Sequence, residues 1–186
     1  MKKLLIVVLF FTVFGNNTFS QNENFSGIYL TSSDFANNNL YLKNNSKDIE
    51  IETALILKPS YVKVITNEKV YYFHKDSIWG FQEEMKIYRF SGSKKLELIS
   101  NEGFLLYKTF VSAKYIKDRI EFYFSENSAS PVLPLSTDNL ETAFKNNPKF
   151  HNLLHSIVVK NDELFGYDEN CKTYKIVNIY KLSLEL

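Results

Sequence analysis

The sequence predicts an α+β fold, in which an antiparallel β-meander over residues 25–125 packs against a helical C-terminal third over residues 136–184. Two observations predict this arrangement. First, short runs rich in Val, Ile, Tyr and Phe alternate with turn residues roughly every eight to ten positions, as in strands joined by tight turns. Second, beyond Pro131 and Pro134 the apolar spacing changes to that of amphipathic helices. The pattern leaves open whether the meander also curls into an open barrel.

The N-terminal elements follow from strand-forming runs and their punctuation. Residues 25–30 are expected to form a strand, and Ser32, Ser33 or Asp34 can cap the short helical turn that follows. Residues 40–43 should be extended. The further strands are expected at 49–57, 61–66, 70–74, 77–82, 86–90, 96–100, 104–109, 112–117 and 119–124. The strongest hairpin turn is 101–103, because its final glycine can take the left-handed conformation.

The C-terminal third is expected to contain two helices before its last segment. Ser136 or Thr137 can cap the first, with Glu141 close behind, and it should run to about Lys145. Pro148 suits the first turn of the second helix. The apolar face of this helix is formed by Phe150, Leu153, Leu154, Ile157 and Val158. We expect this face to pack on the sheet.

The last segment, residues 169–184, fits two structures. Tyr174, Ile176, Tyr180, Leu182 and Leu184 recur at even spacing, as in a strand. The preceding aspartate at 168, followed by a continuous apolar-rich stretch, instead suits a capped helix. We favour the helix.

The first twenty residues have the order of a secretory signal peptide. Lys2 and Lys3 precede an apolar run over 4–14, and small residues lie just before a cleavage position near Ser20-Gln21. This run is well short of the roughly 20 residues that span a bilayer, and no cysteine follows it for lipid attachment. We therefore expect residues 1–20 to be removed and 21–186 to form a single domain. That domain should be exported, either to the periplasm or to the medium, without a membrane anchor.

Charge and cysteine content exclude several classes of partner. Loss of Lys2 and Lys3 changes the formal charge from +1 to −1, so we expect neither nucleic acid nor an anionic membrane held by charge as a partner. Cys171 is the only cysteine, so no intramolecular disulfide forms. Its acidic neighbours Asp168 and Glu169 should raise the thiol pKa, and we interpret it as a buried, inert residue. No cofactor is expected.

The histidines are weak candidates for metal binding or catalysis. His151 and His155 are four residues apart, so they lie on one side of a helix and are the only metal candidates. However, Asn152 occupies the position where a metalloprotease helix carries its catalytic glutamate, and no third ligand is identifiable. His74 near Asp76 is a possible acid–base pair, but histidines are common at strand ends. We expect no metal and no catalytic residue.

Aromatic residues provide the main candidate for ligand binding. Trp79 and Phe81 are expected to share one face of their strand, with Tyr88 and Phe90 opposite them on the next. An exposed strip of this kind can stack on sugar rings or shelter an apolar ligand. The same strip can instead pack as core, which we favour, or form a protein interface.

Several stretches resemble uncharacterised exported proteins of Gram-negative bacteria. They are Gly27-Ile28-Tyr29-Leu30-Thr31 with Asp34-Phe35, Ile78-Trp79-Gly80-Phe81, Tyr88-Arg89-Phe90, and an ending with Phe150, Leu153-Leu154, Tyr167-Asp168 and Tyr174-Lys175-Ile176-Val177-Asn178. The resemblance implies export. It implies no activity and no catalytic residues.

Three functions remain in order of preference. The first is a non-enzymatic envelope protein that binds a small molecule or glycan through the aromatic face at Trp79 and Phe81. The second is a structural or protein-interaction component of the envelope. The third is a hydrolase whose residues converge only in three dimensions. The first is favoured because the chain has no nucleophile elbow, phosphate-binding loop or dinucleotide fingerprint.

Overall fold

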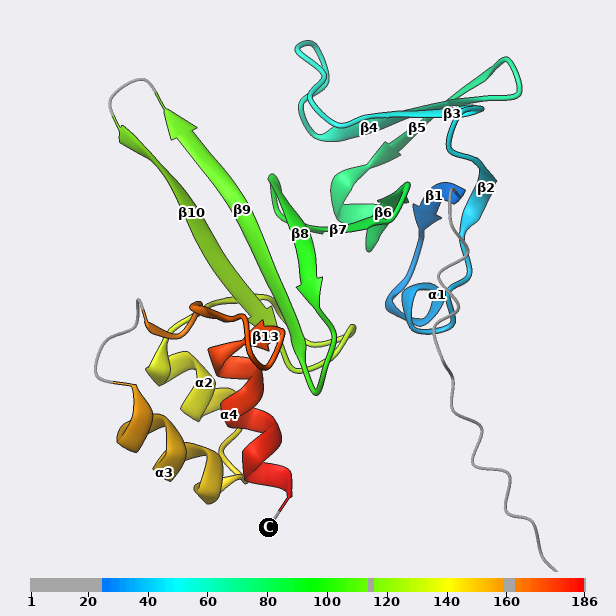
Figure 1. Ribbon diagram of the computed structural model, residues 1–186. Coiled ribbons are helices and arrows are strands. Elements are labelled where there is room, and N and C mark those ends of the chain that lie inside the picture. The colour runs from blue at the N-terminus through cyan, green and yellow to red at the C-terminus, as the bar shows by residue number, and fades with distance from the viewer. Residues whose placement is uncertain (1–24, 114–115, 159–162, 186) are drawn as a thin grey trace, which may run out of the picture.

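A long antiparallel sheet organises the computed structural model of the chain (Figure 1), which describes residues 25–113, 116–158 and 163–185. The strands follow the order β11-β10-β9-β8-β7-β6-β1-β2. They are β1 (Phe25–Tyr29), β2 (Tyr41–Asn45), β6 (Gly80–Glu83), β7 (Lys86–Ser91), β8 (Lys94–Ser100), β9 (Leu105–Ala113), β10 (Ile116–Ser125) and β11 (Leu133–Pro134). The sheet is not closed, because β11 and β2 lie at opposite edges. With helices mainly in the C-terminal part, the α+β prediction is confirmed.

The expected continuous meander is interrupted by a second sheet. This sheet has three strands, β3 (Ile49–Glu52), β4 (Tyr61–Thr66) and β5 (Lys69–His74). Val62 and Val64 of β4 are fully buried and pack towards Ile28 and Phe81 of the large sheet. The small sheet therefore covers one end of one face of the large sheet. The strand expected at 49–57 was predicted too long, since β3 ends at Glu52.

The helical third covers the other end of that same face. It consists of α2 (Thr137–Ala143), α3 (Pro148–Ile157) and α4 (Lys175–Leu184), seen below the long strands in Figure 1. Phe150 and Leu154 of α3 are fully buried against the sheet residues Leu106 and Phe124. The prediction for the apolar face was wrong at Ile157, which is 37% exposed because the helix ends there.

The opposite face of the large sheet is covered by α1 (Ser32–Ala36) and by the segment 126–132. Phe35 of α1 stacks on Trp79 with ring centroids 4.0 Å apart. The Trp79 indole N–H donates to the Ser128 carbonyl at 2.8 Å, and Val132 packs on the same cluster. A sheet with apolar residues on both sides is thus covered on both sides.

Local side-chain bonds start the helices where the sequence suggests. The Ser136 hydroxyl accepts from the Asn139 N–H at the start of α2, and Pro148 occupies the first turn of α3. In α1 the cap is Thr31, one residue before the expected group. Asp34 is the third helical residue and completes a capping box by accepting from the Thr31 N–H at 2.9 Å.

The segment 169–184 combines a turn with a helix. The helix prediction is confirmed for α4, but residues 169–174 belong to a hairpin of β12 (Tyr167–Asp168) and β13 (Thr173–Tyr174). The Asp168 carboxylate accepts from the Asn170 and Cys171 N–H groups, so it caps this turn rather than α4.

The β9–β10 hairpin corrects one further boundary. β9 contains most of the strand expected at 104–109 and the first two residues of the strand expected at 112–117, whereas Ile116 and Lys117 already belong to β10. The break expected at Lys117-Asp118 also lies within β10. Backbone pairing is continuous from Ser125↔Leu105 to Arg119↔Val111, so the polar residues between these pairs also belong to strands. Gly103 has φ +89°, as the predicted turn requires.

Two further findings concern the expected leader and the length of the helices. The expected leader, residues 1–20, and its cleavage position lie outside the described residues. Within the part of the chain that the structure describes, no helix combines the length and apolarity needed to cross a bilayer.

Candidate binding groove

A row of residues crosses the sheet between its two covers. Phe81, Tyr88, Glu97, Lys108 and Phe122 lie opposite one another on successive strands, so they share a face. The first lies beneath the small sheet, and the last stacks on Phe165 of the C-terminal third at 4.5 Å. The three middle residues lie between the covers.

A groove opens here because β8 and β9 diverge. Their pairing ends at Glu97↔Lys108, yet β9 continues to Ala113 and forms a projecting arm with β10 (Figure 1). The resulting β8–β9 groove has a volume of about 650 Å³. Its lining consists of Tyr88, Ser93, Lys94, Lys95, Glu97, Lys108, Thr109, Phe110, Val111, Ser112 and Ile120.

Tyr88 provides the aromatic floor of the groove. Its ring stacks at 4.9 Å on that of its cross-strand neighbour Phe81, which fixes its orientation from one side. The Lys95 ammonium lies 4.7 Å from the ring centroid. Partial burial, followed by the carboxylates of Glu97 and Glu83, raises the pKa of the Tyr88 phenol. The phenol is therefore neutral at physiological pH and can donate a hydrogen bond.

The charge in the groove is mainly positive. Lys94, Lys95 and Lys108 line it, with Glu97 as the single carboxylate. The Lys108 ammonium lies 3.6 Å from a Glu97 carboxylate oxygen. Lys94 is ion-paired with Glu121, just outside this lining, and Lys108 with Glu97, so Lys95 supplies the charge that favours an anionic group in the groove.

The arm contributes an exposed apolar surface. Phe110 of β9 and Ile120 of β10 lie directly opposite each other and are 65% and 55% exposed. Such a pair of large apolar side chains on a projecting hairpin is available for stacking or apolar contact. The groove thus has charged residues on the β8 side and an apolar wall on the arm.

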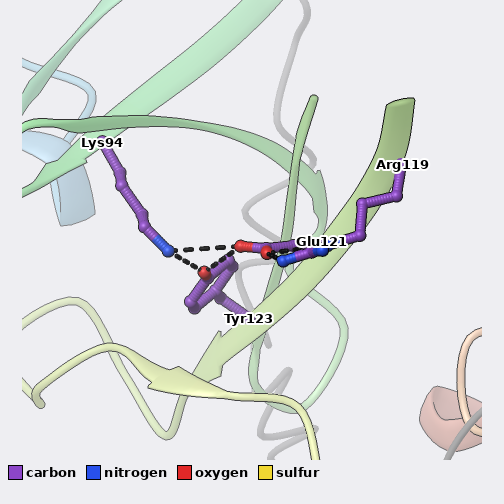
Figure 2. A network of polar contacts seen from close by, with 4 residues as sticks. All are labelled: Lys94, Arg119, Glu121 and Tyr123. Carbon is purple, nitrogen blue, oxygen red and sulfur yellow. Dashed lines mark hydrogen bonds and ion pairs between the residues drawn. The ribbon is translucent and has the colours of Figure 1, made fainter. Parts of the chain in front are cut away.

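A polar network bridges the divergence (Figure 2). Lys94 of β8 donates to the Tyr123 hydroxyl and, at 3.2 Å, to Glu121 of β10. The Tyr123 hydroxyl donates to Glu121 at 2.6 Å, and Arg119 donates at 2.7 Å. The hydrogen bonds from Tyr123, Arg119 and Lys94 lower the pKa of Glu121 to about 2. Lys94 thereby ties the β7–β8 hairpin to the arm.

The aromatic residues singled out from sequence occupy different places. Phe81 and Phe90 are buried beneath the small sheet, and Trp79 is buried on the opposite face beside Arg89, 5.3 Å from its guanidinium. The expectation that Trp79 and Phe81 share a face is therefore wrong. The paired residues of β6 begin at Gly80. Trp79 therefore precedes the strand, and its side chain does not follow the alternation of side chains along β6. Of the four, only Tyr88 lines the groove.

The two helical histidines have separate partners. His151 Nε2 lies 3.0 Å from the Phe144 carbonyl oxygen, and His155 Nε2 lies 2.7 Å from a Glu141 carboxylate oxygen. Among the described residues, no group of three or more His, Cys, Asp or Glu side chains is arranged to hold a metal ion.

His74 has a local structural contact. Its Nδ1 accepts from the Asp76 N–H at 3.3 Å and caps the 3₁₀ turn η1 (Lys75–Ser77). Its ring also packs edge-on against Tyr61 at 5.2 Å. These contacts account for the position of His74 at the end of β5.

Cys171 differs from its expected environment. The residue is exposed in the β12–β13 turn, so the prediction of burial was wrong. Its hydrogen bond and proximity to Asp168 raise the thiol pKa, as the acidic neighbours suggested. A raised pKa lowers the thiolate fraction and with it the nucleophilicity of the residue.

Sequence reasoning missed Lys95, Lys108 and Phe110. The two lysines lie at ordinary exposed strand positions, and their convergence depends on the strand register. Phe110 gave no clear sign either, because the apolar and polar residues around it, 108–112, do not alternate regularly.

Comparisons of the chain with protein-family models, curated proteins and solved structures give no match. The interpretation of the groove therefore rests on its geometry.

Proposed function

We propose that this chain is an exported, non-enzymatic envelope protein that binds an anionic small molecule or glycan in the β8–β9 groove. The observation that carries the proposal is the meeting of Tyr88, Lys95 and Phe110 in one opening of about 650 Å³. This volume lies within the usual range for small-molecule sites, roughly 300–1,000 Å³.

The groove combines two interactions that suit an acidic sugar. Phe110 offers an apolar surface for the face of a pyranose ring, and Tyr88, whose ring lies between Phe81 and the Lys95 ammonium, offers its edge and hydroxyl. The Lys95 and Lys108 ammonium groups can donate charge-assisted hydrogen bonds to carboxylate, phosphate or sulfate oxygens. The Tyr88 hydroxyl, neutral at physiological pH, adds a donor.

The diverging strands add main-chain groups to this set. Beyond Glu97↔Lys108, the facing edges of β8 and β9 lie outside their common ladder. Strand edges present alternating N–H and C=O groups, which match the hydroxyl groups of a sugar. Specificity would then come from lysine charge, and orientation from the main chain.

A non-catalytic role is supported by the groove lining. Among its described residues are one carboxylate, Glu97, and no histidine or cysteine. The carboxylate is paired with Lys108, which disfavours use as a general base at neutral pH. The histidines lie in other parts of the fold.

The same open edges favour one alternative function. A strand from another envelope protein could pair with the free edge of β9 by β-augmentation, using Phe110 as a side-chain contact. This would make the chain a protein-interaction component.

Titration with sugars of matched length tests the proposal. Isothermal calorimetry would compare an acidic oligogalacturonate with a neutral malto-oligosaccharide. We expect the acidic sugar alone to bind, and Lys95→Ala to weaken its affinity about five-fold, from loss of roughly 1 kcal/mol. Tyr88→Ala should weaken it at least as much.

Tyr72→Ala is the matched control. Like Tyr88, Tyr72 of β5 has a lysine ammonium over its ring, that of Lys58 at 4.3 Å from the ring centroid. Tyr72, however, belongs to the small sheet. Its substitution should leave affinity unchanged. Equal losses in the Tyr72 and Tyr88 variants, or binding of neither sugar, would contradict the proposal.

A further inference from the structure

The loop between β3 and β4 exposes two adjacent aliphatic side chains at its tip. Ile56 is 96% exposed and Leu57 is 93% exposed. These are the highest values among the exposed large hydrophobic residues of the described chain. The loop, drawn in cyan in Figure 1, projects from the end of the small sheet, and its two aliphatic residues also line a hollow of about 560 Å³ with Lys58 and Tyr72.

The base of this loop is held by specific contacts. The Lys75 ammonium donates to the Pro59 carbonyl at 2.6 Å, and the Tyr61 N–H donates to the Lys58 carbonyl at 3.0 Å. These contacts hold the C-terminal side of the loop, directly after the tip. Preorganisation of this kind lowers the entropic cost of binding.

Amphipathic side chains surround the base. Tyr61 and Tyr72 are partly exposed, and the Lys58 ammonium lies 4.3 Å from the Tyr72 ring centroid and 6.0 Å from that of Tyr61. An aliphatic tip above a ring of tyrosine and lysine is the order found at membrane–water interfaces. There the apolar groups enter the acyl region, while tyrosine and lysine remain at headgroup level.

We propose that the Ile56–Leu57 tip inserts into the surface of a lipid bilayer. Lys58 would then meet lipid phosphate groups, a charge match that favours lipid. Two other cations lie near the loop: Lys63 is paired with Glu52 at 2.7 Å, and Lys75 is buried with its ammonium on the Pro59 carbonyl. Attachment therefore depends on the aliphatic side chains and one lysine, and it responds weakly to ionic strength.

The size of the tip favours lipid over a protein partner. Two aliphatic side chains bury on the order of 200 Å². A stable protein interface needs about 800 Å² from each partner. A bilayer accepts a small exposed apolar tip without shape complementarity, and the resulting attachment is reversible.

This interaction is independent of ligand binding in the β8–β9 groove. It also differs from the electrostatic attachment that the near-neutral charge of the sequence argues against. The tip would hold the protein at a membrane surface without a spanning segment.

Vesicle co-sedimentation tests the proposal. The protein would be mixed with phosphatidylcholine vesicles and, separately, with vesicles of phosphatidylethanolamine and phosphatidylglycerol. We expect binding to both. The double variant Ile56→Ser/Leu57→Ser should reduce binding at least ten-fold with an unchanged melting temperature. Met85→Ser, at a 73% exposed apolar residue in the β6–β7 turn, is the matched control and should bind as the native protein does.

A spectroscopic readout locates the insertion. An Ile56→Trp variant should show a blue-shifted emission component when vesicles are added, because the new indole leaves water. Absence of native binding to both kinds of vesicle would overturn the proposal. So would equal losses in the tip variant and Met85→Ser, or an Ile56→Trp emission unchanged by vesicles.

Discussion

Glu121 is the residue through which the groove and the stability of the fold are most clearly connected. Its carboxylate accepts hydrogen bonds from Lys94, Arg119 and Tyr123, which join the arm to the β7–β8 hairpin (Figure 2). The substitution Glu121→Gln keeps the shape of the side chain and removes its charge. We predict that it weakens the bridge and lowers the free energy of unfolding.

The size of the effect follows from the pKa of this carboxyl group. A decrease from 4.5 to about 2 corresponds to at most about 3 kcal/mol at neutral pH. Solvent screening reduces this value, since Glu121 is 22%, Lys94 47% and Arg119 55% exposed in their side chains. We therefore expect a loss of about 1 kcal/mol.

The pH dependence of the loss has a definite sign. Because folding lowers the pKa, the bridge stabilises fully above pH 4.5, and this contribution disappears as the pH falls towards 2. Urea unfolding at pH 7 and at lower pH values would compare Glu121→Gln with the native chain. The difference between them should shrink on acidification.

Glu68→Gln, in the exposed turn between β4 and β5, controls for a general effect of charge removal. It should change the free energy of unfolding by less than about 0.5 kcal/mol at either pH. A deficit in Glu121→Gln that stays constant from pH 7 to pH 2.5, or no deficit at pH 7, would refute the reasoning.

Three further substitutions test the packing of the two faces. Leu154→Asp places a charge in the fully buried contact between α3 and the sheet and should prevent folding; a soluble variant with native circular dichroism would show that this contact is dispensable. Arg89→Ala removes the guanidinium that donates to Tyr107 and to the segment 126–132, and urea titration should show a loss of about 3 kcal/mol, with a loss below 1 kcal/mol counting against the role. Gly80→Ala would place a Cβ atom 2.0 Å from the Tyr88 carbonyl oxygen and should cost about 2 kcal/mol; an unchanged melting temperature would contradict this clash.

Local chemistry made several elements readable from the sequence. Ser136 and Pro148 start their helices because capping and a fixed φ act within one turn. The turn at Gly103 depends on a backbone conformation that glycine adopts easily. In each case the determinant lies within four residues of the element.

Longer-range relations were harder to predict. The three-stranded sheet separates from the meander because Val62 and Val64 pack on a distant strand, which alternation alone does not reveal. Trp79 lies just outside the β6 ladder, and a shift of one residue there changes its face.

The lining of the candidate groove was also hard to predict, because it depends on the pairing of distant strands. Tyr88 was identified from the sequence as an aromatic residue on a strand. Its neighbours Lys95 and Lys108 come from two other strands, and their meeting requires the register that ends at Glu97↔Lys108. Strand divergence has no sequence pattern of its own.

Native mass spectrometry of the protein recovered from its own host tests the central claim most directly. The native chain should carry a non-protein adduct with acidic groups, and Lys95→Glu, which reverses a charge in the β8–β9 groove, should lose it. A bare native chain, or an adduct retained by Lys95→Glu, would contradict the assignment of this groove as the binding site.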